Sequence, residues 1–571
     1  MKQLNVTVVG SHIFVTGTEF ANRGTWRRIP ASRWNKVRKH WRYPASPFSA
    51  FRIKYFAEKL GHTIKHDSEF KRLLYDMLHI RELEHNCKKP EAIELAEKTK
   101  ETAFDTVTIP WAHQVLASDF SKKRNSVYLA MDMGTGKTMV GINEFHCSMD
   151  NFVLIVCPLQ VVDVWIDELE KHMPNNNRRV LVLDQGSSSK RADQFNLFTY
   201  HRLKKGPTVV IVNYESLWRG NLGAAFLDAD FDVIVYDEIH KLKAAGSRVS
   251  RFAARLWRSD RFLIGLSGTP FPSGSKIDLY GQYRALDPGV FGPSKSKFQN
   301  RYFEVEMDTR WDKKKQEVVE YPVLVGSRND EELDRLLGLT MFRVEKSDVM
   351  DLPESISVGR YFRLDDNERE IYDEIQDELV AYVKSGTVTA LNALSKAIRL
   401  QQITSGFVKT EEGVEERIGY SKANLLRKIL SQEIPEGEPV CVFCKYTKDL
   451  ATVKRITESL ELRYKEVSGK RKDLERSKYP SNCDVLGLQV QSGGLGVQLQ
   501  KSAYCIFYSI GRSLGEHIQC KDRLHRGGQT RQVMYIYLIA KDSIDEVIKD
   551  AIDAKKEFTD AIYEKIRQII Q

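Results

Sequence analysis

Two series of short apolar runs are the feature that most constrains the fold of this 571-residue chain. The first series lies between Ser126 and Pro270 and reads "SVYLAMD", "FVLIVCP", "VLVLD", "TVVIVN", "FDVIVYDE" and "RFLIGLSGTP". The second lies between Pro439 and Ala540 and reads "PVCVFC", "CDVLGLQV", "AYCIFYS" and "QVMYIYLIA". Strands that lack a polar face and alternate with amphipathic stretches are typical of parallel sheets covered by helices on both sides. The sequence therefore predicts two α/β domains joined by a mainly helical region.

The first hundred residues predict a smaller α/β module. The segment "LNVTVVGSHIFVTG" alternates apolar and polar residues around a Gly-Ser turn, which predicts a hairpin. The segment "SPFSAFRIKYFAEKLG" has apolar residues at helical spacing and a helix stop near Gly61. Two further helices are expected around residues 70–83 and 90–100.

The net charge of the chain is concentrated in this module. Residues 1–60 hold 12 Lys and Arg against two Glu, and this excess of ten equals the net charge of +10 of the whole chain. The stretch from Thr25 to Pro44, "TWRRIPASRWNKVRKHWRYP", interleaves the cations with aromatic residues. Such a concentration favours a polyanionic partner, nucleic acid before an anionic membrane, and a solvated basic face is the alternative.

Neither a membrane span nor a disulfide framework is indicated. No apolar run reaches about 18 residues, and the N-terminus lacks the apolar core and cleavage site of a signal peptide. We therefore expect a soluble protein of the cytoplasm. The eight cysteines are sparse, and most lie in apolar runs, which indicates reduced thiols. Cys441 and Cys444 form a C-x-x-C pair, which we interpret as part of a strand rather than as a redox or zinc site.

The segment "LAMDMGTGKTMV" follows an expected strand and precedes an expected helix, the context of a phosphate-binding loop. Gly134 and Gly136 allow backbone N–H groups to turn toward phosphate oxygens, Lys137 supplies a positive charge, and Thr138 offers a hydroxyl to Mg²⁺. The strict pattern requires glycine where Met131 stands.

Two adjacent carboxylates and a pair of arginines complete the expected chemistry. Asp237 and Glu238 end the apolar strand "FDVIVYDE", where one can hold the Mg²⁺ shell and the other can polarise an attacking water. Arg523 and Arg526 lie three residues apart in "QCKDRLHRGGQ", which we expect to place both on one face of a helical turn. Their charge suits the transition state of phosphoryl transfer.

In chain order, these segments resemble the Swi/Snf-like branch of the superfamily-two (DEAD/DEAH-type) DNA-dependent ATPases, from about Thr108 to Phe558. The resemblance is carried by "IPWAHQ", "DMGTGKT", "CPLQVVDVW", "VNYESL", "YDEIH", "LSGTP", "CVFCKYTKDL", "EVSGK", "QVQSGGLGVQLQ" and "QCKDRLHRGGQ". The ending from Arg523 to Gln529 is characteristic of the branch. Ile239 stands where the family usually has alanine, and Gly527 where it often has isoleucine.

The resemblance implies the fold class and its division along the chain. We expect an α/β protein with two RecA-like parallel-sheet lobes, a helical inter-lobe insertion and a small N-terminal α/β module. The expected domains are a basic, aromatic-rich DNA-recognition module at residues 1–100, a first ATP-binding lobe at 101–285, the insertion at 286–420 and a second helicase C-terminal lobe at 421–571. The resemblance also implies ATP and Mg²⁺ as cofactors.

The resemblance assigns roles to residues of this chain. The expected catalytic residues are Lys137, Asp237, Glu238, Arg523 and Arg526, the two arginines acting from the second lobe when the lobes close. The expected nucleotide-binding residues are Gln114, Asp132, Met133, Gly134, Thr135, Gly136, Lys137, Thr138, Gly494 and Gln519, with Thr138 and Asp237 at the metal. The residues expected to couple nucleotide state to DNA grip are His240, Ser267, Gly268, Thr269 and Gln491. The DNA contacts expected on the lobes are Gln160, Trp165, Asn213, Tyr214, Lys445, Tyr446 and Lys470.

The N-terminal module resembles the substrate-recognition module of HepA-related annealing helicases. The likeness consists of an Ile-Pro, a Trp seven residues before "WRYP", and the basic charge. It implies recognition of branched DNA, with expected contacts from Arg27, Arg28, Trp34, Arg38 and Trp41. The alternative is that Trp34 and Trp41 fill the module's core while only the charges face DNA.

The predicted function is an ATP-driven translocase on double-stranded DNA that remodels branched DNA or protein–DNA complexes, with a role in DNA repair or recombination. The alternatives are an RNA or single-strand helicase, a nucleotide-gated DNA-binding or anti-defence protein, and the motor subunit of a nuclease whose cutting residues lie on a partner. We expect a location near the nucleoid, or in the host cytoplasm if a phage encodes the chain. The sequence predicts no particular protein partner.

Overall fold

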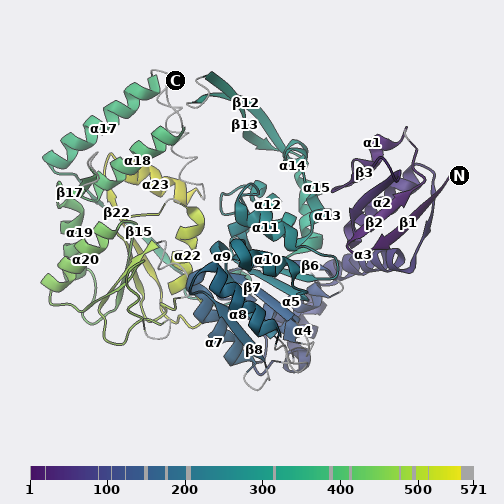
Figure 1. Cartoon of the computed structure of the whole chain (residues 1–571). Helices are drawn as coiled ribbons and strands as arrows, with labels where there is room; N and C mark the ends of the chain where they lie inside the picture. Colours follow the sequence, from purple (N-terminus) through teal and green to yellow (C-terminus); the bar gives the residue numbers. More distant parts are fainter. Residues whose placement is uncertain are drawn as a thin grey trace. The chain divides into compact units, whose positions relative to one another are not determined.

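The computed structural model describes residues 2–19, 21–87, 89–104, 106–122, 124–146, 152–173, 178–200, 208–312, 317–384, 390–409, 415–474, 478–490, 497–511 and 513–554. The chain divides into two compact units (Figure 1). The first unit comprises Met1–Phe271, Lys276–Glu306 and Val323–Val349. The second comprises Pro272–Ser275, Met307–Pro322 and Met350–Gln571.

The first unit begins with a five-stranded sheet in the order β3-β4-β2-β1-β5. Its strands are β1 (Gln3–Val9), β2 (His12–Thr16), β3 (Arg33–Asn35), β4 (His40–Pro44) and β5 (Thr63–His66). The predicted hairpin is confirmed, since β1 and β2 are antiparallel. The predicted helices are confirmed as α2 (Pro47–Lys59), α3 (Ser68–Asn86) and α4 (Pro90–Ala103), and a short α1 (Arg23–Trp26) precedes β3.

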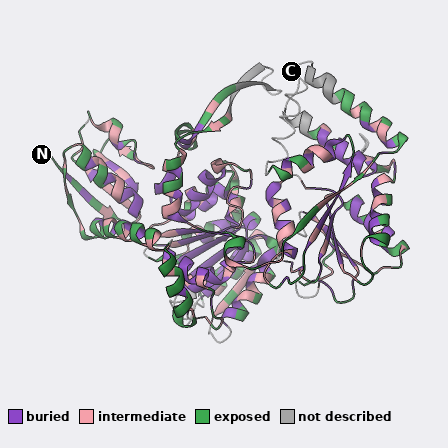
Figure 2. Cartoon of the chain, turned by 180° about the vertical axis from the view of Figure 1, so that it is seen from behind, coloured by how far each residue is buried: buried purple, intermediate pink, exposed green. Residues whose placement is uncertain are grey.

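A parallel seven-stranded sheet forms the centre of the first unit, in the order β14-β6-β11-β10-β7-β9-β8. Its strands are β6 (Ser126–Met131), β7 (Phe152–Cys157), β8 (Arg179–Leu183), β9 (Thr208–Asn213), β10 (Val233–Asp237), β11 (Phe262–Leu266) and β14 (Met341–Val344). Every residue of β7 and β9 is buried, as expected for strands covered on both faces (Figure 2). All six runs predicted in the first series are therefore confirmed as parallel strands.

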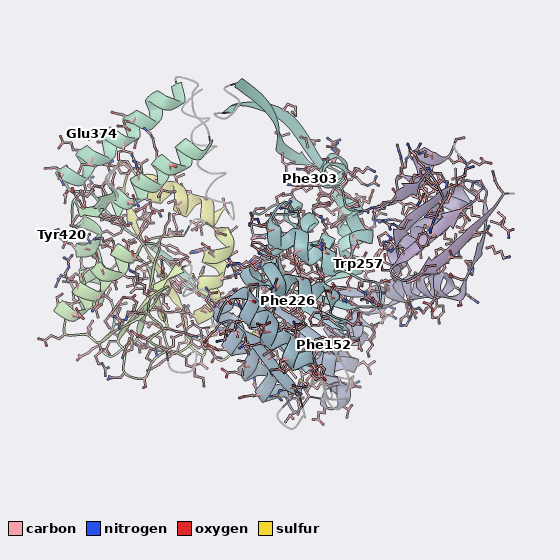
Figure 3. The ribbon with its side chains drawn as sticks, in the orientation of Figure 1. Phe152, Phe226, Trp257, Phe303, Glu374 and Tyr420 are labelled. Atoms are coloured by element: carbon pink, nitrogen blue, oxygen red, sulfur yellow. The ribbon has the colours of Figure 1, made fainter. Side chains whose placement is uncertain are left out.

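The other elements of this part of the chain are helices, which connect the strands of the sheet, and the strands β12 and β13, which belong to a separate two-stranded sheet. They are α5 (Ala112–Ser121), α6 (Lys137–His146), α7 (Val162–His172), α8 (Ser188–Tyr200), α9 (Tyr214–Leu217), α10 (Gly220–Asp228), α11 (Arg248–Leu256), α12 (Leu279–Leu286), α13 (Pro288–Phe291), α14 (Lys295–Tyr302), β12 (Phe303–Asp312), β13 (Glu317–Ser327), α15 (Asp330–Thr340) and α16 (Lys346–Val349), with 3₁₀ turns η1 (Leu159–Val161), η2 (Ile239–Leu242) and η3 (Lys276–Asp278). Phe152 and Phe226, labelled in Figure 3, belong to the apolar core under these helices.

The second unit contains a parallel six-stranded sheet in the order β15-β22-β21-β18-β20-β19. Its strands are β15 (Ile356–Phe362), β18 (Val440–Cys444), β19 (Tyr464–Val467), β20 (Val485–Gln489), β21 (Tyr504–Phe507) and β22 (Met534–Ala540). The other elements are α17 (Asp366–Lys384), α18 (Ala390–Thr404), β16 (Phe407–Lys409), β17 (Glu415–Arg417), α19 (Ser421–Gln432), α20 (Thr447–Ser459), α22 (Leu514–Leu524) and α23 (Ile544–Asp553). The four runs of the second series are confirmed, and Cys441 and Cys444 are buried free thiols within β18.

The region expected as a helical insertion, residues 286–420, contributes a strand to each sheet. β14 pairs with β6 in the first sheet, and β15 pairs with β22 in the second. Apart from short exchanged segments, the boundary between the two compact units lies between Val349 and Met350, within this region. The sequence does not predict β15, because this strand is exposed or half-buried along its length and so lacks an apolar run. None of the helices in the described part of the chain combines the length and apolarity needed to span a bilayer.

Candidate active site

The expected phosphate-binding loop lies between β6 and α6, at the carboxyl edge of the parallel sheet. Gly134 and Gly136 have φ angles of 89° and 80°, in the left-handed region that favours glycine. A Cβ at position 136 would lie 1.9 Å from Nε2 of Gln114, so only glycine fits there. Gln114 donates to the carbonyl of Thr135 at 3.1 Å, and its Oε1 accepts from the backbone of Trp111 at 2.8 Å. The predicted glutamine is therefore held directly against the loop.

A neighbouring histidine also holds this loop and is absent from the predicted residues. Nε2 of His113 lies 2.8 Å from the carbonyl of Thr135. Burial lowers the pKa of His113, which favours a neutral imidazole that donates to this carbonyl. The only sequence signal is its place beside Gln114 in "IPWAHQ".

The loop is also fixed by the chain that follows β14. Asp132 donates its backbone N–H to Val344 at 3.1 Å, and its carboxylate accepts from the backbone of Lys346 at 3.0 Å. The Thr135 hydroxyl donates to the carbonyl of Asp132 at 2.7 Å. Met133 is buried, Lys137 at the start of α6 is 8% exposed, and Thr138 is half-buried. A lysine this far buried requires a negative partner nearby.

Asp237 and Glu238 lie at the end of β10, two strands from β6 in the same sheet. Oδ2 of Asp237 accepts from the indole of Trp165 at 2.8 Å, and Oδ1 accepts from the backbone of Glu238 at 3.0 Å. Burial and then the charge of Glu238 raise the pKa of Asp237 to about 6, while the charge of Lys137 acts in the opposite direction. A further cation would relieve this unfavourable concentration of negative charge.

Glu238 has a φ of 52°, an unusual backbone conformation for a residue other than glycine, and it begins the turn η2. Its Oε2 lies 3.2 Å from Nδ1 of His240 and accepts from the hydroxyl of Ser267 at 3.4 Å. Nδ1 of His240 is 3.0 Å from that hydroxyl, which also accepts from the backbone of Thr269 at 3.1 Å. The ends of β10 and β11 are thus connected through one polar cluster.

Two glycines allow this cluster to pack closely. A Cβ at Gly268 would lie 3.2 Å from the backbone nitrogen of Met133, so the segment after β11 runs against the phosphate-binding loop. A Cβ at Gly265 would lie 2.8 Å from Cδ1 of Ile239. The glycine in β11 therefore makes room for the isoleucine that replaces the family's usual alanine.

The predicted DNA contacts on the first lobe divide by exposure. Gln160 is exposed. Asn213 is 7% exposed, and its amide donates to Glu215 at 2.9 Å. The predictions for Trp165 and Tyr214 are corrected. Both side chains are buried, and both donate to Asp237, Trp165 to its carboxylate and Tyr214 to its backbone carbonyl at 2.8 Å. Both side chains are thus directed at the end of β10, and neither is exposed for contact with a DNA strand.

In the second unit, Gln519 and Arg523 lie on α22 and are buried, with 7% and 4% exposure. The expectation of one helical face for both arginines is corrected. The helix ends at Leu524, and Arg526 is half-buried in the turn that follows. Gly528, with a φ of 93°, continues this turn, in which the backbone of Gln529 donates to Arg526 at 3.0 Å.

The other predicted residues of this unit differ in their surroundings. Lys445 and Tyr446, after β18, are half-buried, and both side chains donate to the amide oxygen of Gln401. Lys470 is exposed. Gln491 and Gly494 lie outside the described residues.

The aromatic residues of the N-terminal module are mostly internal. Trp41 is 2% exposed and belongs to the module's core, so its predicted contact with DNA is corrected. Trp26 is also buried. Trp34 is half-buried and packs on Trp41 with ring centroids 5.2 Å apart. Arg27, Arg28 and Arg38 are exposed, as DNA contacts require.

The site offers a few oxygen donors of the kind that Mg²⁺ binds, and these donors do not make up a complete metal-binding cage. Within the described part of the chain, no group of three or more His, Cys, Asp or Glu could enclose a metal ion. Mg²⁺ in nucleotide sites is held by one or two protein oxygens together with phosphates and water. The Asp237 carboxylate and the Thr138 hydroxyl are donors of that type.

Comparison with known proteins gives the following matches. The profile of the SNF2-related domain matches residues 70–407, and that of the helicase conserved C-terminal domain matches residues 421–528. The nuclear protein STH1/NPS1 of Saccharomyces cerevisiae is 25% identical over 74% of this chain and 32% of its own length. Putative protein p41 of Acyrthosiphon pisum secondary endosymbiont phage 1 is 24% identical over 80% of this chain and 98% of its own length.

A solved structure, the Sulfolobus solfataricus SWI2/SNF2 ATPase core in complex with dsDNA, is 22% identical. The match covers 82% of this chain and 98% of that one, with a TM-score of 0.37. The chain spans about a third to a half of the length of the first curated relatives that it matches.

Proposed function

The protein belongs to the SNF2-related family, whose profile matches more than half of the chain, and from this premise we propose that it hydrolyses ATP to translocate on double-stranded DNA. The observation that carries the proposal is the polar cluster after β10, which lies at the same sheet edge as the phosphate-binding loop and is bonded to the segment after β11. The carboxylates proposed to act on ATP are thus hydrogen-bonded to the segment after β11, which can respond to a change at the nucleotide.

The residues of the first lobe have separable roles in this proposal. The backbone of the loop and the Lys137 ammonium bind the phosphates. Glu238 accepts a proton from the attacking water, and its contacts with His240 and Ser267 fix the orientation of its carboxylate. When bound, Mg²⁺ neutralises phosphate charge, and Asp237 and Thr138 are the residues that would hold it.

The second lobe supplies positive charge in this proposal. Arg523 and Arg526 are assigned to the transition state of phosphoryl transfer, and Gln519 to nucleotide binding. Burial of Arg523 supports a positioned rather than a solvated guanidinium. Gln160, Lys445, Tyr446 and Lys470 remain the proposed DNA contacts of the lobes, mainly to phosphates and sugars, so binding is sequence-independent and salt-sensitive, whereas Asn213 is buried like Trp165 and Tyr214.

The test is ATP hydrolysis by the full chain with double-stranded DNA, single-stranded DNA and RNA at matched nucleotide concentration. We expect the strongest stimulation from duplex DNA and displacement of a third strand from a triplex. Strongest stimulation by RNA or single strands would replace the proposal with a helicase. Stimulation without displacement would indicate a nucleotide-gated DNA-binding protein.

We also propose that the module of residues 1–100 directs this motor to branched DNA. Its exposed arginines and its charge support a DNA-binding role. The test compares hydrolysis with plain, forked and four-way DNA in the unmodified chain and in a variant with Arg27, Arg28 and Arg38 changed to glutamine. A preference for branched DNA that persists in the variant would contradict the role.

A further inference from the structure

The outer face of the N-terminal sheet brings like charges together. Arg33 of β3 lies directly opposite Arg42 of β4, and Arg42 lies opposite Phe14 of β2. Like charges in directly opposed positions destabilise a sheet. Because this pair does not favour the sheet, its placement suits an anion bound over the outer face of the two strands.

Two hollows meet at this pair of arginines. The first has a volume of about 520 Å³ and is lined by Phe14, Trp34 and His40 together with Lys36 and Arg38. The second, of about 320 Å³, lies between the module and the first lobe and is lined by Arg251 and Arg255 of α11 and by Arg284 of α12. Arg33 and Arg42 line both hollows. We name the continuous surface of the two hollows the arginine groove.

No residue that lines the arginine groove is acidic. Among the described residues, the guanidinium groups of Arg33, Arg42, Arg251 and Arg255 form no ion pair, and the last of these only approaches the Phe252 ring, at 6.0 Å. Burial and then the nearby arginines lower the pKa of both His12 and His40, which reflects the positive potential of this face. Trp257, labelled in Figure 3, is one of the residues of the first lobe that line the second hollow.

The two hollows differ in the chemistry that they offer. The second offers cations, which suit phosphates, and the first adds the ring of Phe14, which is half-buried and lies outside the module's core cluster. A cationic track beside an aromatic ring is the arrangement that binds a single strand, whose bases have free faces. The bases of a duplex are stacked on one another and offer no such face.

We propose that the arginine groove binds a single-stranded segment of DNA, with phosphates against the arginines of both walls and a base stacked on Phe14. This inference rests on the proposed DNA-binding role of the module, and it adds a substrate class and a second wall contributed by the first lobe. None of the predicted motor residues lies on α11, and none of the DNA contacts predicted on the two lobes lines the groove.

The first test measures binding of labelled oligo(dT), about ten nucleotides long, to the full chain by fluorescence anisotropy. We expect the variant Arg251→Gln/Arg255→Gln to bind at least about tenfold more weakly. The variant Lys54→Gln/Lys59→Gln, which removes two exposed charges from α2 of the same module, is the control and should change binding less than about twofold. Equal affinity of the two double variants for oligo(dT) would overturn the proposal.

The second test separates stacking from charge with an abasic strand of the same length. The unmodified chain and the variant Phe14→Trp should bind oligo(dT) about tenfold more tightly than the abasic strand. The variant Phe14→Ala should bind both strands equally. A preference for bases that persists in Phe14→Ala would contradict the assigned role of the ring.

Two controls identify the ligand and the state of the motor. Affinity for a blunt duplex should change less than about threefold in Arg251→Gln/Arg255→Gln, and a loss equal to that for oligo(dT) would mean a general phosphate surface and overturn the proposal. Tighter binding of oligo(U) than of oligo(dT) would overturn the choice of DNA. The rate of ATP hydrolysis at saturating duplex DNA should be unchanged in Arg251→Gln/Arg255→Gln. If no DNA stimulates the unmodified chain, the proposed motor function fails, and the groove is still tested by the binding results.

Discussion

The first unit contains two polar regions of opposite design, the polar cluster after β10, which we propose to be catalytic, and the arginine groove. In the cluster, both carboxylate oxygens of Asp237 accept hydrogen bonds, and Glu238 is bonded to His240 and Ser267. In the groove, arginines from four elements lie close together, and none of the described carboxylates forms an ion pair with Arg33, Arg42 or Arg251.

This difference indicates what each region requires of its ligand. A site that accelerates a reaction must hold its groups in place before the substrate arrives, because reorganisation during the reaction is costly. A binding surface can leave its charges solvated and obtain order from the ligand itself. Substitutions in the cluster should therefore change the rate of hydrolysis, and those in the groove should change affinity.

The largest expected effect is that of Glu238→Gln. Loss of the general base should lower the rate of ATP hydrolysis at least about 10³-fold, while nucleotide binding is kept because the loop after β6 is untouched. Steady-state hydrolysis and binding of a fluorescent ATP analogue measure the two properties. Asp228→Asn, an exposed carboxylate on α10, is the control and should leave both unchanged. A substantial rate in Glu238→Gln would remove Glu238 from the mechanism.

A second prediction concerns Asp287, at the seam between the module and the lobe. Asp287 caps α13 and accepts from the backbone of Gly289, whose carbonyl accepts from Arg52 of the module at 2.6 Å. Burial raises the pKa of Asp287 to about 6. The folded chain therefore binds this proton more tightly than the unfolded chain, so stability falls as pH rises from about 4 through 6.

The asparagine side chain of the variant Asp287→Asn cannot ionise, so the stability of this variant should not fall in the same way as pH rises. We expect the free energy of unfolding of the unmodified chain to fall by about 2–3 kcal/mol more than that of the variant over this pH range. Chemical denaturation of both proteins between pH 4 and 7 measures the difference. Parallel pH profiles would show that Asp287 is already ionised when buried.

The third prediction concerns Trp165→Phe. Removing the indole donor leaves one oxygen of the buried Asp237 without its partner, which costs about 1.5–3 kcal/mol for a charged group. We expect about a tenfold lower rate of hydrolysis and a higher Mg²⁺ requirement at half-maximal rate. Trp218→Phe, at a half-buried tryptophan that directly follows α9, is the matched control. Unchanged Mg²⁺ dependence in Trp165→Phe would mean that the indole does not position Asp237.

Trp165 also shows what the sequence does not predict, namely which atoms a side chain contacts. The apolar runs predicted ten strands correctly, because burial on both faces leaves a clear pattern in the residues. The roles of Trp165 and Tyr214 followed from their motifs, and motifs record that a residue matters without recording which atoms it touches. Only the packing of α7 and α9 against β10 reveals that both side chains donate to Asp237.

The strands β14 and β15 were beyond prediction because neither is a continuous buried run. The arginine groove was beyond prediction because it joins residues distant in sequence, such as Arg42 and Arg251. Basic composition predicted a charged module, but the pairing register places Arg33 opposite Arg42. The partner wall on α11 leaves no local signal in "RVSRFAARL", which has the pattern of an ordinary amphipathic helix.

The smallest expected effect compares two arginines from the same basic stretch, Arg33 and Arg27. Both are exposed, but only Arg33 lines the groove. We expect Arg33→Gln to weaken binding of oligo(dT) about fivefold and to lower the slope of log affinity against log salt by about 0.7, the value for one phosphate contact with a single strand. Arg27→Gln should change binding less than about twofold, and neither variant should alter hydrolysis at saturating duplex DNA. Equal losses in the two variants would mean that net charge alone attracts the strand, and the distinction between a shaped groove and a basic surface would fail.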